Sequence, residues 1–260
     1  MRMFTGSSLQ PETIDLRSCA IGTKGLHRDL NRLPKPVARY FRHVLEEEQA
    51  LIREVHLTQE GKFRVSRTGN WYPFQATQCF MTRPAGFVWN AVVHMAPMLN
   101  VYVRDAYLEG HASMEAKILK VIPWVKKADE LELTAAAMQR YLAEAIWFPT
   151  ALLPSDHVTW TALTDSKALA TLSDCCMEVS LEFEFNDEGE VTTIYAPNRY
   201  AFINNEWKLT PWLCHCSGYQ KRYGILIPTQ VSVEWIYKDG AFSYFDGKVL
   251  DIDYEYHIGY

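Results

Sequence analysis

Much of this chain alternates apolar and polar residues with a period of two. Residues 178–185 read EVSLEFEF, and residues 250–257 read LDIDYEYH. Because successive side chains of a β-strand point to opposite faces, this alternation predicts strands with one buried and one wet face. Short turn-forming segments separate roughly eleven or twelve such strands. The strands are expected over residues 52–65, 73–83, 87–96, 100–109, 111–119, 157–163, 167–173, 175–185, 190–196, 206–220, 226–238 and 243–258.

Two segments have the pattern of a helix. Residues 37–45 follow two prolines, which suit a first helical turn because the missing N–H would be unpaired there. Residues 134–147 contain the strong helix formers AAAMQRYLAEAIW, with Thr134 as the expected N-cap. The apolar stripe of this second helix includes Met138 and Tyr141.

Strands in succession without a β–α–β rhythm predict an α+β fold built on one large antiparallel sheet. A sheet of about 11 strands must curl. We expect a half-barrel whose open side is covered by one or two helices around an apolar cavity. Residues 1–33 have no clear period and are expected to form an irregular N-terminal arm, and residues 34–260 a single half-barrel domain.

Charge and composition exclude some classes of protein. The net charge is −5 with scattered basic residues, whereas nucleic-acid binding usually needs a basic stripe. No apolar run approaches the roughly 18–20 residues of a membrane span. The first 19 residues are too polar for a signal peptide, so we expect a cytoplasmic protein with mostly free cysteines. The oligomeric state stays open.

The sequence PWLCHCSGY places a histidine between two cysteines. In a strand, Cys214 and Cys216 share a face with Trp212, whereas His215 points to the other face. The three side chains therefore cannot hold one metal without a bulge, and the chain has no CxxC pair. We expect no metal here and interpret the thiols as small apolar residues, or as a soft or reactive lining of the cavity.

Two carboxylates lie where the pattern predicts burial. Asp105 occurs in the inward row of residues 101–107, and Glu144 occurs one helical turn after Arg140. A desolvated acid and base could serve catalysis, with Asp105 as base and Glu144 as acid. The alternative is structural: Arg104, Arg140 or a backbone amide satisfies Asp105, or its face is wet, and Glu144 forms an i,i+4 surface pair with Arg140.

His94, between apolar neighbours on a predicted strand, is either a cavity residue or a hydrogen-bonded core residue. The chain has no P-loop, GxGxxG, GxSxG or HExxH motif, so we expect no cofactor.

Several long segments resemble a bacterial family described only as a domain of unknown function. They are LPKPVARYFRHVL, GFVWNAVVHMAP, VRDAYLEG, RYLAEAIWFPTALLPS, VSLEFEFNDEGEV, TPW and IPTQVSVEW, and they extend from about Leu33 to Tyr256. The resemblance implies that Trp89, Asp105, Tyr107, Glu144, Trp147, Pro149 and Trp212 are residues typical of the family. Residues 213–217 and 1–30 depart from the family's pattern. The family is more loosely similar to lipoprotein-carrier half-barrels, in which helices cover a curled sheet around an apolar cavity.

The expected function is binding of an apolar small molecule or acyl chain in the half-barrel cavity. The residues expected to line it are Trp89, His94, Tyr107, Tyr141, Trp147, Trp212, Cys214 and Cys216. The alternative is a cofactor-independent cyclase or isomerase that uses Asp105 and Glu144 on a hydrophobic intermediate in the same cavity. An interaction module with a filled interior is the third hypothesis.

Overall fold

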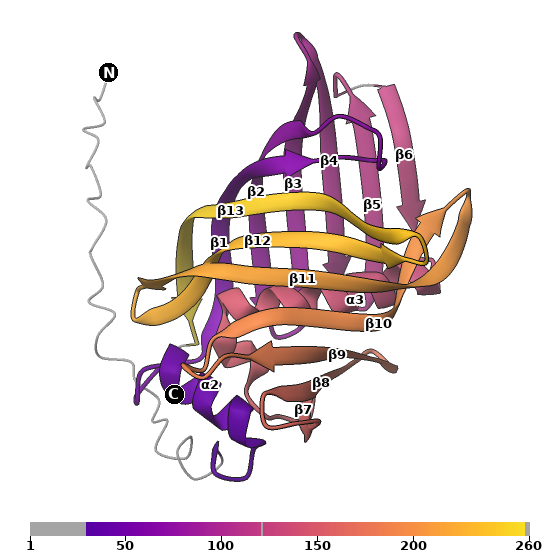
Figure 1. Cartoon of the computed structure of the whole chain (residues 1–260). Coiled ribbons are helices and arrows are strands. Elements are labelled where there is room, and N and C mark those ends of the chain that lie inside the picture. The colour runs from indigo at the N-terminus through magenta and orange to yellow at the C-terminus, as the bar shows by residue number, and fades with distance from the viewer. Residues whose placement is uncertain (1–29, 121, 258–260) are drawn as a thin grey trace, which may run out of the picture.

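A computed structural model describes residues 30–120 and 122–257. Among these residues, thirteen strands form one antiparallel sheet in the order β6-β5-β4-β3-β2-β1-β13-β12-β11-β10-β9-β8-β7 (Figure 1). The bounds are β1 Ile52–Phe63, β2 Tyr72–Thr82, β3 Ala85–Ala96, β4 Leu99–Leu108, β5 His111–Ile118, β6 Ile122–Ala128, β7 Val158–Ala162, β8 Lys167–Asp174, β9 Met177–Phe185, β10 Val191–Ile203, β11 Glu206–Arg222, β12 Ile225–Tyr237 and β13 Gly240–Tyr256. The predicted curled half-barrel with helices is confirmed, with more strands than expected.

The sheet curls around helix α3, Leu131–Glu144. The helix contacts β3, β4 and β5 on one side and β9 and β10 on the other, so it lies between the two halves of the sheet (Figure 1). Two remote strands also meet, because the hydroxyl of Tyr107 on β4 donates a hydrogen bond to Asp174 at the end of β8, 2.5 Å away. The curl therefore brings strands from opposite ends of the sheet together.

The helix α3 begins one turn earlier than the sequence indicated. Its N-cap is Glu130, and Thr134, the expected cap, is buried within the helix and bonds through its N–H to the Glu130 carbonyl. The chain then continues through the short 3₁₀ turns η2, Ala145–Trp147, and η3, Pro149–Leu152. Pro149 accounts for the break, because it cannot donate the next helical hydrogen bond.

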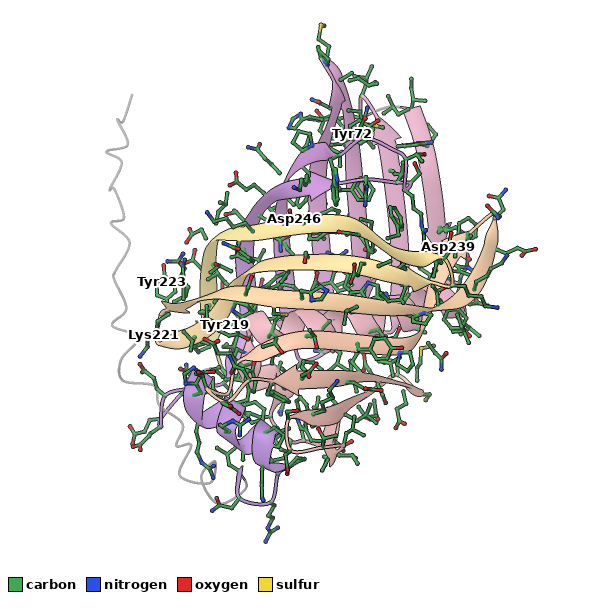
Figure 2. The ribbon with its side chains drawn as sticks, viewed as in Figure 1. Tyr72, Tyr219, Lys221, Tyr223, Asp239 and Asp246 are labelled. Atoms are coloured by element: carbon green, nitrogen blue, oxygen red, sulfur yellow. The ribbon has the colours of Figure 1, made fainter. Side chains whose placement is uncertain are left out.

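Helix α2, Lys35–Val44, covers one end of the half-barrel and contacts β8, β9 and β12. Val37, Tyr40, Phe41 and Val44 form its buried stripe, as a helical period of 3.6 requires. Beside the helix, Lys221 on β11 forms a 2.8 Å ion pair with Glu46; Figure 2 shows Lys221 at this end of the molecule.

Apolar side chains fill much of the concave side of the sheet. Met138, Leu142 and Phe148, from α3 and the chain that follows it, have at most 1% of their surface exposed. The Phe148 ring packs against Phe80 on β2, with 4.6 Å between centroids, and against Tyr141, at 5.6 Å. The helical segment thus occupies the space that the sequence pattern assigned to an apolar cavity.

Two local features escaped the sequence pattern. Strand β6 contains Pro123 and lies at the sheet edge, where a missing N–H breaks no ladder bond. A register shift in β13 pairs Thr58 with Asp251 but Gln59 with Val249, so that Leu250, expected inside, is 44% exposed.

The expected irregular arm, 1–33, lies outside the described residues except for its last four. Within the described part of the chain, no helix is long and apolar enough to cross a membrane.

Candidate functional site

The expected site residues divide between the two faces of the sheet. Trp89, Asp105 and Tyr107 lie on the concave face of β3 and β4, and Trp212, Cys214 and Cys216 follow the buried alternation of β11. Tyr141, Glu144 and Trp147 extend from α3 and η2 and are buried or half-buried. His94 is exposed on the convex face, where its Nδ1 lies 2.9 Å from the Asn100 side-chain oxygen. It is therefore separated from the other residues.

One guanidinium joins the two carboxylates that could have formed an acid–base couple. Arg140 Nη1 lies 2.6 Å from Asp105 Oδ2, and Arg140 Nε lies 2.9 Å from Glu144 Oε1. Gln78 Nε2 donates to the other Glu144 oxygen over 2.8 Å. All three charged side chains are at most 20% exposed. The cluster links α3 to β2 and β4. These contacts match the structural role, rather than the catalytic role, that the sequence allowed for Asp105 and Glu144.

Aromatic rings surround this cluster. The Arg140 guanidinium carbon lies 4.9 Å from the Phe87 ring centre and 5.1 Å from that of Trp89. The indole N–H of Trp89 donates to Gln59 Oε1 over 3.0 Å. Rings at this distance attract a cation most strongly where water is excluded, so they help to stabilise the Arg140 guanidinium in this position.

Two opposing effects set the pKa values of the cluster: burial disfavours the charged forms, and ion pairing favours them. Burial raises the pKa of Glu144 above its usual 4.5, and the charge and hydrogen bond of Arg140 only partly offset this effect. Burial lowers the pKa of Arg140, but the two carboxylates more than compensate, so that its pKa lies above the ordinary value.

The raised pKa of Glu144 predicts a specific pH dependence of stability. Ionising Glu144 costs the folded protein more than the unfolded chain, so its contribution is fully present below pH 4.5 and is lost as pH rises through the raised pKa. As pH rises from 4.5 through the raised pKa, the free energy of unfolding of the wild type should therefore fall relative to that of Glu144→Gln. Urea unfolding across this range measures the difference, and parallel pH curves would refute it.

A cleft of about 510 Å³ opens near the C-terminal end of α3. Its walls come from the start of β1, the β2–β3 turn, the segment from η3 to β7, and the end of β8. Tyr141 lines it, and the Tyr141 hydroxyl donates to the Met81 carbonyl over 3.1 Å. Asp174, the partner of Tyr107, also lines it. Two expected residues therefore reach this cleft, Tyr141 directly and Tyr107 through Asp174.

The cleft has both apolar and polar walls. Its apolar residues are Leu51, Ile52, Pro84, Ala85, Ala151, Leu153, Pro154, Val158 and Leu172, and its polar residues include Thr82, Arg83, Ser155, Asp156, His157, Ser173, Asp174 and His257. Burial, helped by the charges of Arg83 and Arg53, lowers the pKa of His257 below its usual 6.5. His257 is therefore mainly neutral at pH 7, so Arg83 is the main cationic side chain of the wall.

The cysteines of β11 are buried beside each other. Cys214 and Cys216 are 5% and 7% exposed, and His215 points outward to Glu234, 3.1 Å away. The hydrogen bond with Cys214 and burial raise the pKa of Cys216 well above its usual value, so it stays a thiol. All five cysteines of the described residues are free. The expected separation of the cysteines from the histidine is confirmed.

The tryptophans of the concave side have partners within the protein. The indole N–H of Trp147 donates to the Pro228 carbonyl, and that of Trp212 donates to the Tyr244 hydroxyl, each over 3.0 Å. The guanidinium of Arg199 lies 4.9 Å above the Trp212 ring and donates to the Ala136 carbonyl of α3. These contacts fix α3 against β10, β11 and β12.

Sequence reasoning missed most of the cleft. Arg83, His157 and His257 come from segments far apart in the chain, and none belongs to a recognisable local motif. Only the folding of the sheet brings them to one opening. From the sequence, only Tyr141 was assigned to a cavity and also lines this cleft; residues 148–154, FPTALLP, become η3 and one wall of it.

The fold and the site define a half-barrel of antiparallel strands that closes over an internal helix and leaves a cleft at one end. The chain belongs to a family of unknown function, DUF6920, whose model matches residues 31–254. This confirms the family resemblance noted from the sequence. Among curated proteins, none matches the chain.

The chain also has distant similarity to several solved structures. A domain assigned to outer membrane lipoprotein sorting, from Vibrio parahaemolyticus, is 6% identical with a TM-score of 0.45, over 87% of this chain and 93% of that one. A LolA superfamily protein from Nitrosomonas europaea is 9% identical with a TM-score of 0.40, over 84% and 91%. A DUF1329 family protein from Desulfovibrio piger is 10% identical with a TM-score of 0.45, over 86% and 94%.

Proposed function

We propose that this protein binds a small amphipathic molecule, with an apolar body and a polar or anionic head, in the cleft beside α3. The supporting observation is the cleft itself. Its volume of about 510 Å³ lies within the range of roughly 300–1,000 Å³ that is typical of small-molecule sites. The expected apolar ligand is retained in this proposal, but its site moves from the middle of the half-barrel to one end.

The chemistry of the walls supports an amphipathic ligand. Leu153, Val158 and Leu172 supply apolar surface, which favours a hydrocarbon portion. Arg83 at the β2–β3 turn supplies positive charge for an anionic head group. Carboxylates also line the cleft, at Asp156 and Asp174, and the latter already accepts the hydroxyl of Tyr107. A fatty-acid-like molecule with one charged end suits this arrangement.

The enzyme alternative has no comparable support. Asp105 and Glu144 are both bound to Arg140, and neither lines the cleft. A general base must reach the proton that it removes, and neither carboxylate is placed to reach a molecule in the cleft. The observed contacts give these two residues a structural role.

A tryptophan inside the cleft tests the binding proposal. Ala151 on η3 lines the cleft, whereas Ala162 on β7 is exposed outside it. Ala151→Trp should fill part of the volume and weaken ligand binding at least roughly tenfold, whereas Ala162→Trp should leave binding unchanged. Binding is measured by native mass spectrometry and by the shift in melting temperature with saturated fatty acids of increasing length and with the matching alcohols.

The panel also separates the hypotheses. Equal shifts with acids and alcohols would refute a role for the Arg83 charge, and equal binding to both tryptophan variants would place the ligand elsewhere. Absence of binding to the whole panel would favour an interaction module.

We propose the cytoplasm as the compartment, in keeping with free thiols at the described cysteines. Cell fractionation tests this proposal.

A further inference from the structure

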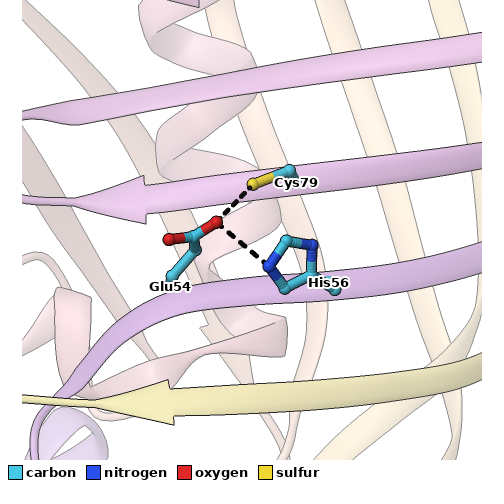
Figure 3. A group of neighbouring side chains, drawn as sticks. All are labelled: Glu54, His56 and Cys79. Carbon is cyan, nitrogen blue, oxygen red and sulfur yellow. Dashed lines mark hydrogen bonds and ion pairs between the residues drawn. The ribbon is translucent and has the colours of Figure 1, made fainter. Parts of the chain in front are cut away.

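A mixed group of metal-ligating side chains lies on the convex face of the sheet, away from the cleft. Glu54 and His56 alternate with buried residues of β1, so both point outward. Strand pairing places Cys79 of β2 directly opposite His56. Figure 3 shows the three side chains turned toward one another. We refer to them as the convex-face triad.

The triad has the separations that a shared ion requires. Glu54 Oε1 lies 3.0 Å from His56 Nε2 and 3.3 Å from Cys79 Sγ. One ligand atom from each residue lies within 4.8 Å of the other two. Tetrahedral zinc bonded at about 2.0–2.3 Å keeps its ligand atoms roughly 3.3–3.8 Å apart. Small rotamer changes would therefore suffice to surround an ion.

The donor atoms favour a borderline soft cation. One thiolate sulfur, one imidazole nitrogen and one carboxylate oxygen are all accepted by Zn²⁺, whereas Mg²⁺ and Ca²⁺ prefer oxygen alone. We propose that Glu54, His56 and Cys79 bind a zinc-like divalent cation on the convex face.

The surroundings add negative charge. Strand β13 pairs beside β1 and carries Asp251, Asp253 and Glu255 at alternate outward positions, with Asp253 directly opposite His56. Arg53 pairs with Glu255 and also lies 3.9 Å from Glu54 Oε2. A pocket of about 300 Å³ opens beside two members of the triad, with His56, Cys79 and Asp253 among its lining residues. Accumulated carboxylates attract a divalent cation and are stabilised by it.

Without a metal ion, Cys79 and Glu54 are joined by a hydrogen bond. Cys79 donates its thiol hydrogen to Glu54, and burial together with this carboxylate raises the pKa of Cys79 to about 12. Binding Zn²⁺ would form the Zn–S bond and release the thiol proton to solvent, with no change of oxidation state. Affinity should therefore increase with pH.

No metal was expected from the sequence, because neither CHC nor any CxxC offered a compact ligand set. Glu54 and His56 are 25 and 23 positions from Cys79. The hairpin register of β1 and β2 is what brings them together.

Titration of chelator-treated, reduced full-length protein tests the proposal. The wild type should bind one equivalent of Zn²⁺ in competition with a chromophoric chelator. It should also bind Co²⁺ with a near-ultraviolet thiolate-to-cobalt absorption band. Cys79→Ser should abolish that band and weaken Zn²⁺ binding by more than roughly 100-fold, which exceeds the usual effect of removing an outer partner of a ligand. His56→Gln, a change at a half-exposed side chain, should weaken binding without unfolding.

Exposed Cys176 supplies the matched control, because it lies on the β8–β9 turn and outside the triad. Cys176→Ser should retain both the zinc affinity and the cobalt band. Loss of binding in Cys176→Ser with retention in Cys79→Ser would overturn the proposal. The absence of saturable Zn²⁺ binding in the folded wild type would also overturn it.

Discussion

Arg140→Met is expected to lower the free energy of unfolding by about 3–5 kcal/mol, because it leaves two carboxylates without their shared cation. Asp105 and Glu144 are 18% and 17% exposed, and both contact Arg140 at hydrogen-bond distance. Methionine preserves much of the apolar stem that packs beside Phe87 and Trp89. The loss is therefore mainly electrostatic.

Two further variants separate charge from packing. Arg104→Met, at an exposed position of the same strand as Asp105, should change stability by no more than about 0.5 kcal/mol. The triple change Arg140→Met, Asp105→Asn and Glu144→Gln should recover a large part of the loss, because it leaves no uncompensated charge. Urea unfolding measures all three. A loss below about 1 kcal/mol for Arg140→Met would show that Asp105 and Glu144 find other partners.

This cluster illustrates which part of the site the sequence could predict. Alternation assigned Asp105 to an inward row, and helical spacing put Glu144 one turn from Arg140. Joining the two observations requires knowing that α3 lies against β4, which is a tertiary contact. The sequence pattern favoured the structural alternative without excluding the catalytic one, and the 2.6 Å contact between Arg140 and Asp105 supplies the structural partner.

The fold was easier to predict than the site, because period-two alternation is a local property. The prediction from alternation failed at two places that depend on the sheet as a whole. Strand β6 contains Pro123, which is tolerated at a sheet edge, and a register shift turns Leu250 outward. His94 was misplaced for a related reason. Val93 is buried and His94 exposed, but the apolar neighbours on both sides hid the alternation at that point.

Whether the half-barrel itself can hold a ligand depends on how firmly its interior is filled. Phe148 is fully buried between Phe80 and Tyr141, directly after the turn that ends the internal helix. Phe148→Ala should lower the free energy of unfolding by about 3–5 kcal/mol, as expected for a large aromatic side chain removed from a packed core. Phe202→Ala, at a side chain that is 44% exposed, should cost less than about 1 kcal/mol.

The cavity left by Phe148→Ala provides the more informative test. An apolar void of this kind stays dry and accepts small hydrocarbons. Benzene or toluene should therefore raise the melting temperature of Phe148→Ala and leave that of the wild type unchanged. A similar rise in both proteins would reveal apolar space already present inside the wild-type half-barrel, and the proposed binding site would then move from the end cleft back to the interior. A rise confined to the variant would leave the cleft beside Tyr141 as the place where this protein can take up a ligand without first losing part of its core.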